Sequence, residues 1–274
     1  MDQDFQTRFA GIARLYGPAA LNRIRSAHVA VVGLGGVGSW TVEALARSGV
    51  GALTLIDLDE VCLSNVNRQL PALDGAIGQF KAEALAERVR TINPACIIRP
   101  IVEFFTESSA ERLLEPAYHA VVDAIDRVAN KARLIAACRD RKLPLIASGG
   151  AGGRTDPTRI HVKDLAEVTH DRLLAEVRSR LRREHGFPPA GQRMGIPCVV
   201  SSEPPIPPRI DAGECAVPEE QARSRRLGCD WGYGSAAFVT GAFGLATAAW
   251  VIRHIVERPA EQDRAEGTDP LRRP

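Results

Sequence analysis

The sequence lacks several features that would assign it at once to a class of protein. None of its six cysteines are paired at the C-x-x-C spacing, and their scatter does not resemble a disulfide framework. The N-terminus, MDQDFQTRFA, carries acidic residues and no apolar core, so it is not a signal peptide. We therefore expect a cytoplasmic protein. Only four of the cationic residues are lysines: Lys81, Lys131, Lys142 and Lys163.

The charge balance is also close to even. The formal net charge is +2, so no strong electric field surrounds the whole molecule. Hydrophobic residues make up 45% and charged residues 25%, which is typical of a soluble globular chain. The 274 residues suffice for one large α/β domain. We expect that domain at 1–256, with a nucleotide-binding half at 26–150 and a substrate half at 151–256, before a disordered tail at 257–274.

One stretch, from His28 to Asp59, organises the chain. A short β-branched run, Val29–Val32, predicts a buried strand, and a helical pattern follows at Ser39–Ser48. A second strand at Leu53–Ile56 ends in Asp57. This is a complete βαβ unit with a G-x-G-x-x-G turn between its first strand and its helix. The glycines of the turn are Gly33, Gly35, Gly36 and Gly38.

Glycines in such a turn let a phosphate approach the backbone N–H groups, because no Cβ atoms intervene. The N-terminus of the following helix adds unpaired N–H donors and a partial positive charge. Asp57 would accept hydrogen bonds from a ribose. The fingerprint alone leaves NAD and ATP both open, and a turn without any ligand is the structural alternative.

The next stretch favours ATP. The runs LDEVCLSNVNRQ and GQFKAE place polar and cationic side chains just past the end of the second strand. Arg and Lys beside a glycine-rich turn suit a triphosphate, which carries more negative charge than a dinucleotide. These side chains are Asp59, Asn65, Asn67, Arg68, Gln69 and Lys81.

Together these motifs resemble the ATP-binding core of ubiquitin-activating-enzyme-like proteins, including the adenylating enzymes of molybdopterin and thiamine biosynthesis. The resemblance implies ribose binding by Asp57 and phosphate contacts from Asn65, Arg68 and Lys81. It also implies a magnesium aspartate at Asp126, in the run VVDAIDRVANK. The structural alternative for Asp126 is the N-cap of the helix that follows, at Ala129–Arg141. Many such proteins hold a structural zinc through two C-x-x-C pairs, which this sequence lacks, so we predict no zinc.

The rest of the first half alternates between strands and helices, as expected for a Rossmann-like, largely parallel sheet with helices on both faces. Gly33, Asp57 and Asp126 should then share one edge of the sheet. A second glycine cluster, Ser148–Arg154, follows a strand and either admits a substrate or cation to the backbone or is a tight connection. The expected strands are Ile97–Val102, His119–Ala124 and Leu143–Ala147, and the expected helices are Ala82–Asn93, Ser108–Leu114 and Ala129–Arg141. We expect Ser108 or Ser109 to be the N-cap of the second of these helices, and the N-terminal run RFAGIARLYGPAAL to form a short amphipathic helix.

The second half is less regular. A helix at Asp171–Gly186 carries an arginine-rich face, which is either solvated or contacts nucleic-acid phosphates. A strand at Ile196–Ser202 carries Cys198, and a long proline-rich connection with Arg223, Arg225 and Arg226 follows at 203–233. The uncharged run Gly234–Ile252 predicts a buried helix, with a membrane span as the less favoured alternative.

Five motifs narrow the resemblance to tRNA threonylcarbamoyladenosine dehydratases: ARLYG, VGSWTVEALARSG, LIDLDEVCLSNVNRQ, VVDAIDRVANKA and SGGAGG-x-x-DP-x-x-I. This family adenylates the carboxylate of a threonylcarbamoyl group on an adenosine next to the anticodon of ANN-decoding tRNAs, and the activated group then cyclises with loss of water. The resemblance implies ATP and Mg²⁺ as cofactors, catalytic roles for Arg68, Lys81 and Asp126, and a homodimer in which an N-terminal arginine, with Arg14 as the candidate, reaches the partner's ATP.

Alternatives remain at this point. An activator of a ubiquitin-like sulfur carrier would use the same adenylation, and a non-catalytic scaffold for sulfur-transfer proteins, such as a cysteine desulfurase, would keep only the nucleotide site. In some relatives a cysteine accepts the acyl group, and Cys198 is the candidate here. The alternative interpretation of Cys198 is a small buried core residue.

Overall fold

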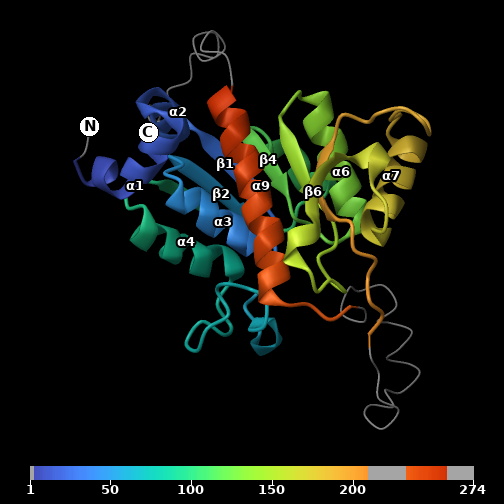
Figure 1. Ribbon diagram of the computed structural model, residues 1–274, viewed down its shortest axis with the longest axis horizontal. Coiled ribbons are helices and arrows are strands. Elements are labelled where there is room, and N and C mark those ends of the chain that lie inside the picture. Colours follow the sequence, from blue (N-terminus) through green and yellow to red (C-terminus); the bar gives the residue numbers. More distant parts are fainter. Residues whose placement is uncertain (1–2, 209–232, 258–274) are drawn as a thin grey trace.

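A single sheet of seven strands forms the centre of the molecule (Figure 1). The computed structural model describes residues 3–208 and 233–257. The strand order is β3-β2-β1-β4-β5-β7-β6. All neighbouring pairs are parallel except β6 and β7. The strands are β1 His28–Val32, β2 Ala52–Ile56, β3 Ile97–Ile101, β4 Ala120–Asp123, β5 Leu145–Ser148, β6 Ile160–Asp164 and β7 Pro197–Ser201.

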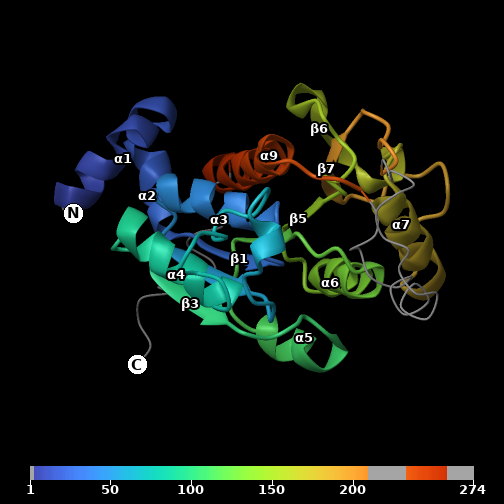
Figure 2. The ribbon, with the colours of Figure 1, turned by 90° about the horizontal axis from the view of Figure 1, so that it is seen from below.

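Helices cover both faces of the sheet (Figure 2). On one face lie α3, α4 and α9, and on the other lie α5, α6 and α7. The helices are α1 Gln3–Tyr16, α2 Pro18–Ser26, α3 Gly38–Arg47, α4 Lys81–Ile92, α5 Glu107–Leu113, α6 Val128–Asp140, α7 Arg172–Glu184 and α9 Ala237–Glu257. The expected α/β class and its largely parallel sheet are therefore confirmed.

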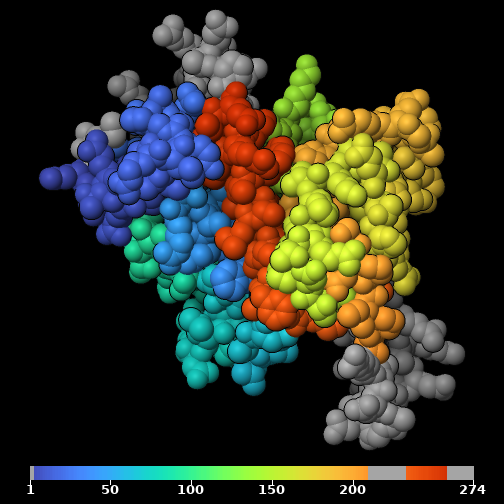
Figure 3. Space-filling view, in the orientation of Figure 1, coloured from blue at the N-terminus to red at the C-terminus, as the bar shows by residue number. Residues whose placement is uncertain are grey.

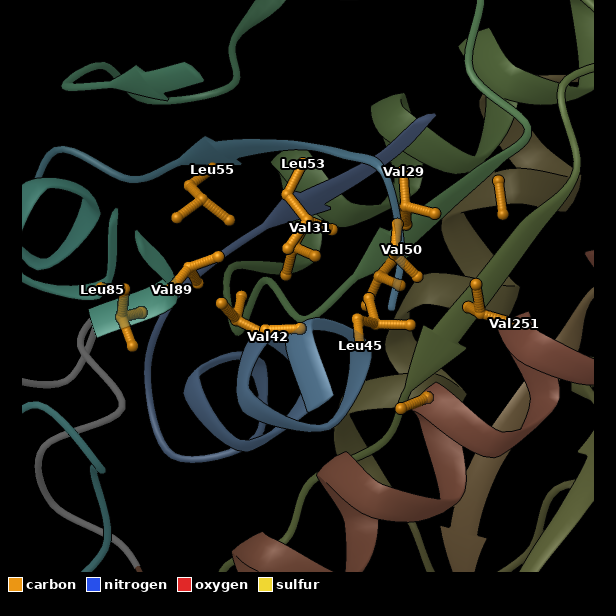
Figure 4. Close-up of a cluster of buried hydrophobic side chains, with 14 of the residues drawn as sticks. Val29, Val31, Val42, Leu45, Val50, Leu53, Leu55, Leu85, Val89 and Val251 are labelled. Carbon is orange, nitrogen blue, oxygen red and sulfur yellow. The ribbon is translucent and has the colours of Figure 1, made fainter. Parts of the chain in front are cut away.

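The alternating direction of the side chains along β1, a central strand, explains why a hydrophobic core forms on each face of the sheet. Val29 and Val31 of β1 point into the core beneath α3, whereas Ala30 and Val32 point into the core beneath α6. Figure 4 shows Val29 and Val31 facing Val42 and Leu45 of α3. Because all five residues of β1 are buried, the strand has no polar face, as parallel strands covered on both sides require.

The C-terminal helix α9 packs against the sheet and α3, as the buried-helix prediction expected. Among the described residues it is the one helix long and apolar enough to cross a membrane. Thr240 and Thr247 each donate to a carbonyl group of their own helix. Figure 3 shows α9 as a stripe along one face of the molecule, so part of it is uncovered; Phe238 and Leu245 are exposed.

Two local expectations were wrong, and others concern residues that the structure does not describe. The N-terminal region forms two helices, because Gly17 adopts φ +90° and Pro18 starts a new helix. Helix α5 is capped by Thr106, with Ser109 completing a capping box, and not by Ser108 or Ser109. Residues 209–232 and 258–274, which include Arg223, Arg225, Arg226 and the predicted tail, lie outside the part of the chain that the structure describes.

The α3–α9 contact yields a stability prediction. A Cβ added at Gly244 would lie 2.6 Å from Trp40 Cβ and 2.7 Å from the Val37 carbonyl oxygen. Gly244→Ala should therefore force the helices apart and lower the free energy of unfolding by roughly 1–3 kcal/mol. Gly11→Ala is the matched control, because Gly11 lies in α1 with nothing within 4 Å of the added methyl. Urea unfolding should show Gly11→Ala unchanged or slightly stabilised; equal stability of the two variants would contradict the packing argument.

Candidate active site

The glycine turn between β1 and α3 is held tightly against neighbouring backbone. Gly33 adopts φ +87°, and a Cβ there would lie 2.7 Å from the Ala124 carbonyl oxygen of the β4–α6 loop. A Cβ at Gly38 would overlap the Gly33 carbonyl oxygen. Side chains are thus excluded at both positions, and the turn exposes backbone at the carboxyl edge of the sheet.

Asp57, at the end of β2, ties this turn to the next loop. Its Oδ2 accepts a hydrogen bond from the Leu34 N–H at 2.6 Å, and its Oδ1 accepts one from the Asp59 N–H at 2.8 Å. Burial raises the pKa of Asp57, while these two backbone donors and Lys81 act in the opposite direction. The carboxylate therefore holds the glycine loop against the loop that follows β2.

Lys81 and Asp59 form an ion pair. The Lys81 Nζ lies 2.9 Å from Asp59 Oδ2, and the lysine side chain is 7% exposed whereas that of Asp59 is 54% exposed. The Lys81 N–H also donates to the Asp59 carbonyl. The two residues that the sequence predicted as separate nucleotide contacts are therefore brought together at the start of α4.

Arg68 and Asn65 lie in the loop between β2 and α4. The Asn65 Oδ1 accepts from the Cys62 N–H at 3.0 Å, so this oxygen stabilises the local turn. The Arg68 carbonyl accepts from Trp40 Nε1 at 3.1 Å and from Thr240 Oγ1 at 3.2 Å. Helices α3 and α9 thus fix the backbone of Arg68, a support that the sequence analysis missed because Thr240 lies far along the chain.

Asp126 is exposed in the loop after β4, three residues beyond the buried end of the strand. Arg127 occupies the N-cap position of α6 without a side-chain capping hydrogen bond, so the alternative in which Asp126 is the N-cap of this helix is wrong. The loop that carries this exposed residue lies beside the glycine turn, since the Ala124 backbone approaches Gly33 closely. Magnesium binds through one or two carboxylates together with phosphate oxygens, and a single aspartate here fits that donor set.

A buried ion pair beneath Asp126 was not anticipated. Lys131 and Asp123 are both fully buried, with Nζ and Oδ1 3.1 Å apart. The same ammonium donates to the carbonyl oxygens of Asp123 and Ile125, each at 3.1 Å. Burial raises the pKa of Asp123 to about 6, and Lys131 opposes the rise. All three N–H groups of the lysine thus hold the loop that leads to Asp126.

Comparison with known proteins matches this arrangement over nearly the whole chain. The ThiF family model matches residues 8–269. The tRNA threonylcarbamoyladenosine dehydratase of Escherichia coli is 44% identical over 94% of this chain and 97% of its own length. The crystal structure of the E. coli tRNA N6-threonylcarbamoyladenosine dehydratase in complex with ATP superposes with a TM-score of 0.82, at 40% identity, over 97% of this chain and 99% of that one.

The chain belongs to the tRNA threonylcarbamoyladenosine dehydratases of the ThiF family. A more distant relative, the E. coli molybdopterin-synthase adenylyltransferase, is 38% identical over only 47% of this chain and 51% of its own length. The resemblance predicted from the motifs is thereby confirmed at the level of the dehydratase family.

The structure speaks against Cys198 as an acyl acceptor in this dehydratase-family chain. Cys198 is fully buried in β7, and its thiol contacts the Ile196 carbonyl oxygen. Burial raises the pKa of this thiol, which disfavours the nucleophilic thiolate. The arrangement supports the alternative interpretation of a small core residue.

The arginines of α7 are mostly engaged within the protein. Arg178 donates to the carbonyl oxygens of Leu165 and Val168, and Arg182 donates to that of Pro188. Arg172, Arg180 and Arg183 pair with glutamates of the same helix. Arg178 and Arg182 therefore stabilise the fold around α7, and this reduces the number of arginines on α7 that are available to tRNA.

The buried pair gives the second prediction. Lys131→Met removes the ammonium and leaves the Asp123 carboxylate buried without its partner, which should lower the free energy of unfolding by about 3–5 kcal/mol. Lys142→Met, at an exposed lysine, is the control and should change stability little. The double variant Asp123→Asn, Lys131→Met should recover much of the loss in chemical denaturation. A Lys131→Met variant as stable as wild type would show that the pair contributes nothing.

Proposed function

We propose that this protein catalyses the ATP-dependent cyclisation, with net loss of water, of the threonylcarbamoyl group on the tRNA adenosine next to the anticodon. The observation that carries the proposal is the match of the whole chain to dehydratases, including an ATP-bound structure, with the glycine turn, Asp57, Lys81 and Asp126 gathered at one edge of the sheet. The molybdopterin-type relative supports only adenylation, because it matches less than half of the chain.

The chemistry starts from a poor electrophile. The substrate carboxylate attacks the α-phosphate of ATP, so that a C–O–P bond forms and pyrophosphate leaves. An atom of the same side chain then attacks the acyl carbon, AMP leaves, and the ring closes. Arg68 and Lys81 supply positive charge beside the triphosphate, and positioning contributes most of the rate enhancement.

Magnesium belongs to the proposal through Asp126. An exposed carboxylate next to triphosphate oxygens repels them unless a cation lies between them. Mg²⁺ binds to carboxylate and phosphate oxygens together, so it suits this position. When bound, the ion supplies neutralisation of the charge that develops on the leaving pyrophosphate. Asp126 would hold the ion, and Lys131 would keep the Asp126 loop in place.

A homodimer is also part of the proposal. Arg14 is exposed on α1, beside Leu15 at 70% exposure and Tyr16 at 36%. Apolar side chains of this size at the surface suit a protein interface, and an arginine among them suits contact with a partner's nucleotide. Sedimentation equilibrium should give twice the chain mass, and a monomer at micromolar concentration would contradict the dimer.

A cytoplasmic location is the last part of the proposal. The free cysteines of the described residues agree with a reducing compartment of this kind.

The third prediction tests the reaction and the metal role together. Asp126→Asn keeps the shape of the side chain but removes the charge that binds Mg²⁺. It should fold with near wild-type stability and lose ATP-dependent ring closure by several orders of magnitude. Asp74→Asn, at another exposed aspartate, is the control and should remain active. Cys198→Ala should keep much of the activity, because the adenylate is captured within the substrate.

The measurement is mass spectrometry of the nucleosides of modified tRNA after incubation with enzyme and ATP, where the product is lighter by one water. Absence of this product with wild-type enzyme would refute the proposed reaction. ATP–pyrophosphate exchange that depends on a protein ending in Gly-Gly, and not on tRNA, would favour the sulfur-carrier alternative. Full activity of Asp126→Asn would refute its metal role alone.

A further inference from the structure

The second glycine cluster ends in a buried arginine whose hydrogen bonds are incomplete. Arg154 is only 4% exposed, and its Nη2 donates to the His170 carbonyl oxygen. Its Nε and Nη1 are buried and have no hydrogen-bond partner among the residues that the structure describes. The sequence left the role of this cluster open between substrate approach and a tight connection, and Arg154 provides the observation that separates the two.

With these hydrogen bonds alone, the Arg154 guanidinium contributes little to the stability of the fold. A buried charge without its full set of partners costs free energy, and burial lowers the pKa of Arg154 accordingly. Lys131 shows the contrast, since its ammonium donates three hydrogen bonds within the protein. A buried cation that the described residues do not satisfy is typical of a site that a ligand completes.

The nearby carboxylates do not complete it. Asp171 accepts from the N–H groups of Gly150 at 2.8 Å and Leu174 at 2.9 Å, so it caps α7. Glu203 accepts from the N–H groups of Thr155 and Asp156. Within the described residues no ion pair joins Arg154 to either carboxylate. Both acidic groups favour the charged form of Arg154 electrostatically while their oxygens are bound elsewhere.

Arg154 lies at a different part of the sheet edge from the residues predicted to contact the triphosphate. The loop 149–154 follows β5, which lies between β4 and β7 (Figure 2). Because these three strands are parallel, their carboxyl ends share the edge that carries Asp126. The glycine turn, Arg68 and Lys81 lie on the β1–β2 side of that edge, and Arg154 lies on the opposite side of Asp126.

Side chains from later in the chain cover the end of the second glycine cluster, at Gly153. A Cβ at Gly153 would lie 2.7 Å from Tyr233 Cδ1 and 3.0 Å from Pro205 Cβ. Tyr233 is itself 45% exposed, and Ile206, whose N–H donates to the Gly153 carbonyl oxygen, is 42% exposed. Gly153, the residue before Arg154, is therefore covered by side chains that are themselves partly exposed.

We propose that Arg154 binds the carboxylate of the threonylcarbamoyl group through charge-assisted hydrogen bonds and holds it for attack on ATP. The proposal rests on the proposed function, which requires one carboxylate to be brought beside the triphosphate. Guanidinium matches carboxylate geometry, and it also reduces the repulsion between the two anions. The triphosphate has its own predicted contacts at the other side of Asp126, which is why we assign Arg154 to the carboxylate and not to a nucleotide phosphate.

The experiment measures the affinity of the full-length protein for two forms of one tRNA, with and without the threonylcarbamoyl group, in the presence of a non-hydrolysable ATP analogue. Wild type should bind the modified form more tightly. Arg154→Gln should reduce this preference by roughly 10- to 100-fold, the usual effect of losing hydrogen bonds to a charged group. Its affinity for the ATP analogue should stay within about twofold, as expected where no phosphate contact is lost.

Arg159→Gln is the matched control, because it removes an exposed arginine five positions away and should keep the preference. Arg154→Lys keeps the charge without the planar fork and should lose part of the preference. It also decides the matter if Arg154→Gln does not fold, since an undiminished preference in a folded Arg154→Lys would overturn the proposal.

Two further outcomes would overturn it. If Arg154→Gln keeps the preference, the guanidinium does not bind the carboxylate. If it keeps the preference but loses affinity for the ATP analogue, the ligand of Arg154 is a nucleotide phosphate. Ring closure by wild-type enzyme in the same preparation separates these results from a failure of the proposed function, which would show as no product and no preference for modified tRNA in wild type.

Discussion

The close approach of two backbones, Gly33 against the Ala124 carbonyl, is the constraint on which the rest of the site depends. A side chain at Gly33 would push the glycine turn away from the β4–α6 loop. The contact brings the loop that carries Asp126 beside the glycine turn. Asp57 then secures the turn from the other side through Leu34. The geometry of the site is thus set by the absence of side chains at glycine positions as much as by the polar residues themselves.

Buried polar groups around this edge fall into two kinds. All three donors of the Lys131 ammonium are used, by Asp123 Oδ1 and by two adjacent carbonyl oxygens, so this lysine fixes the loop before Asp126, although Asp123 Oδ2 has no hydrogen-bond partner among the described residues. Arg154 is equally hidden, yet two of its nitrogens have no partner among the described residues. The first arrangement is what a fold uses for its own structure, and the second is what a binding site retains at some cost in stability. Burial alone would not distinguish them, whereas the count of satisfied donors does.

Local patterns in the sequence predicted most of the fold, because each strand and helix has a clear periodicity and parallel connections constrain the order. The strands around β1 and the helix α3 were placed within one or two residues. The errors arose where one residue determines the local structure. Gly17 divides the N-terminal helix, and Thr106 is the N-cap of α5. The residues predicted for the site all came from recognisable sequence motifs. Contacts between distant segments, such as Thr240 with Arg68 or Lys131 with Asp123, leave no local pattern from which to infer them.

The Lys81–Asp59 pair shows how residues that stabilise one another in the free protein would also serve the proposed nucleotide. Lys81 is buried at its stem and needs a partner for its ammonium, which Asp59 supplies at 2.9 Å. Asp59 is half exposed, so water screens the pair and its net stabilisation is small. A triphosphate carries far more negative charge than one carboxylate and competes well for the same ammonium. Because the lysine is held in place by its buried stem and by the backbone bond to Asp59, the exchange of partners requires little reorganisation. A weak, exposed ion pair is therefore better suited to this position than a strong, buried one such as Lys131–Asp123.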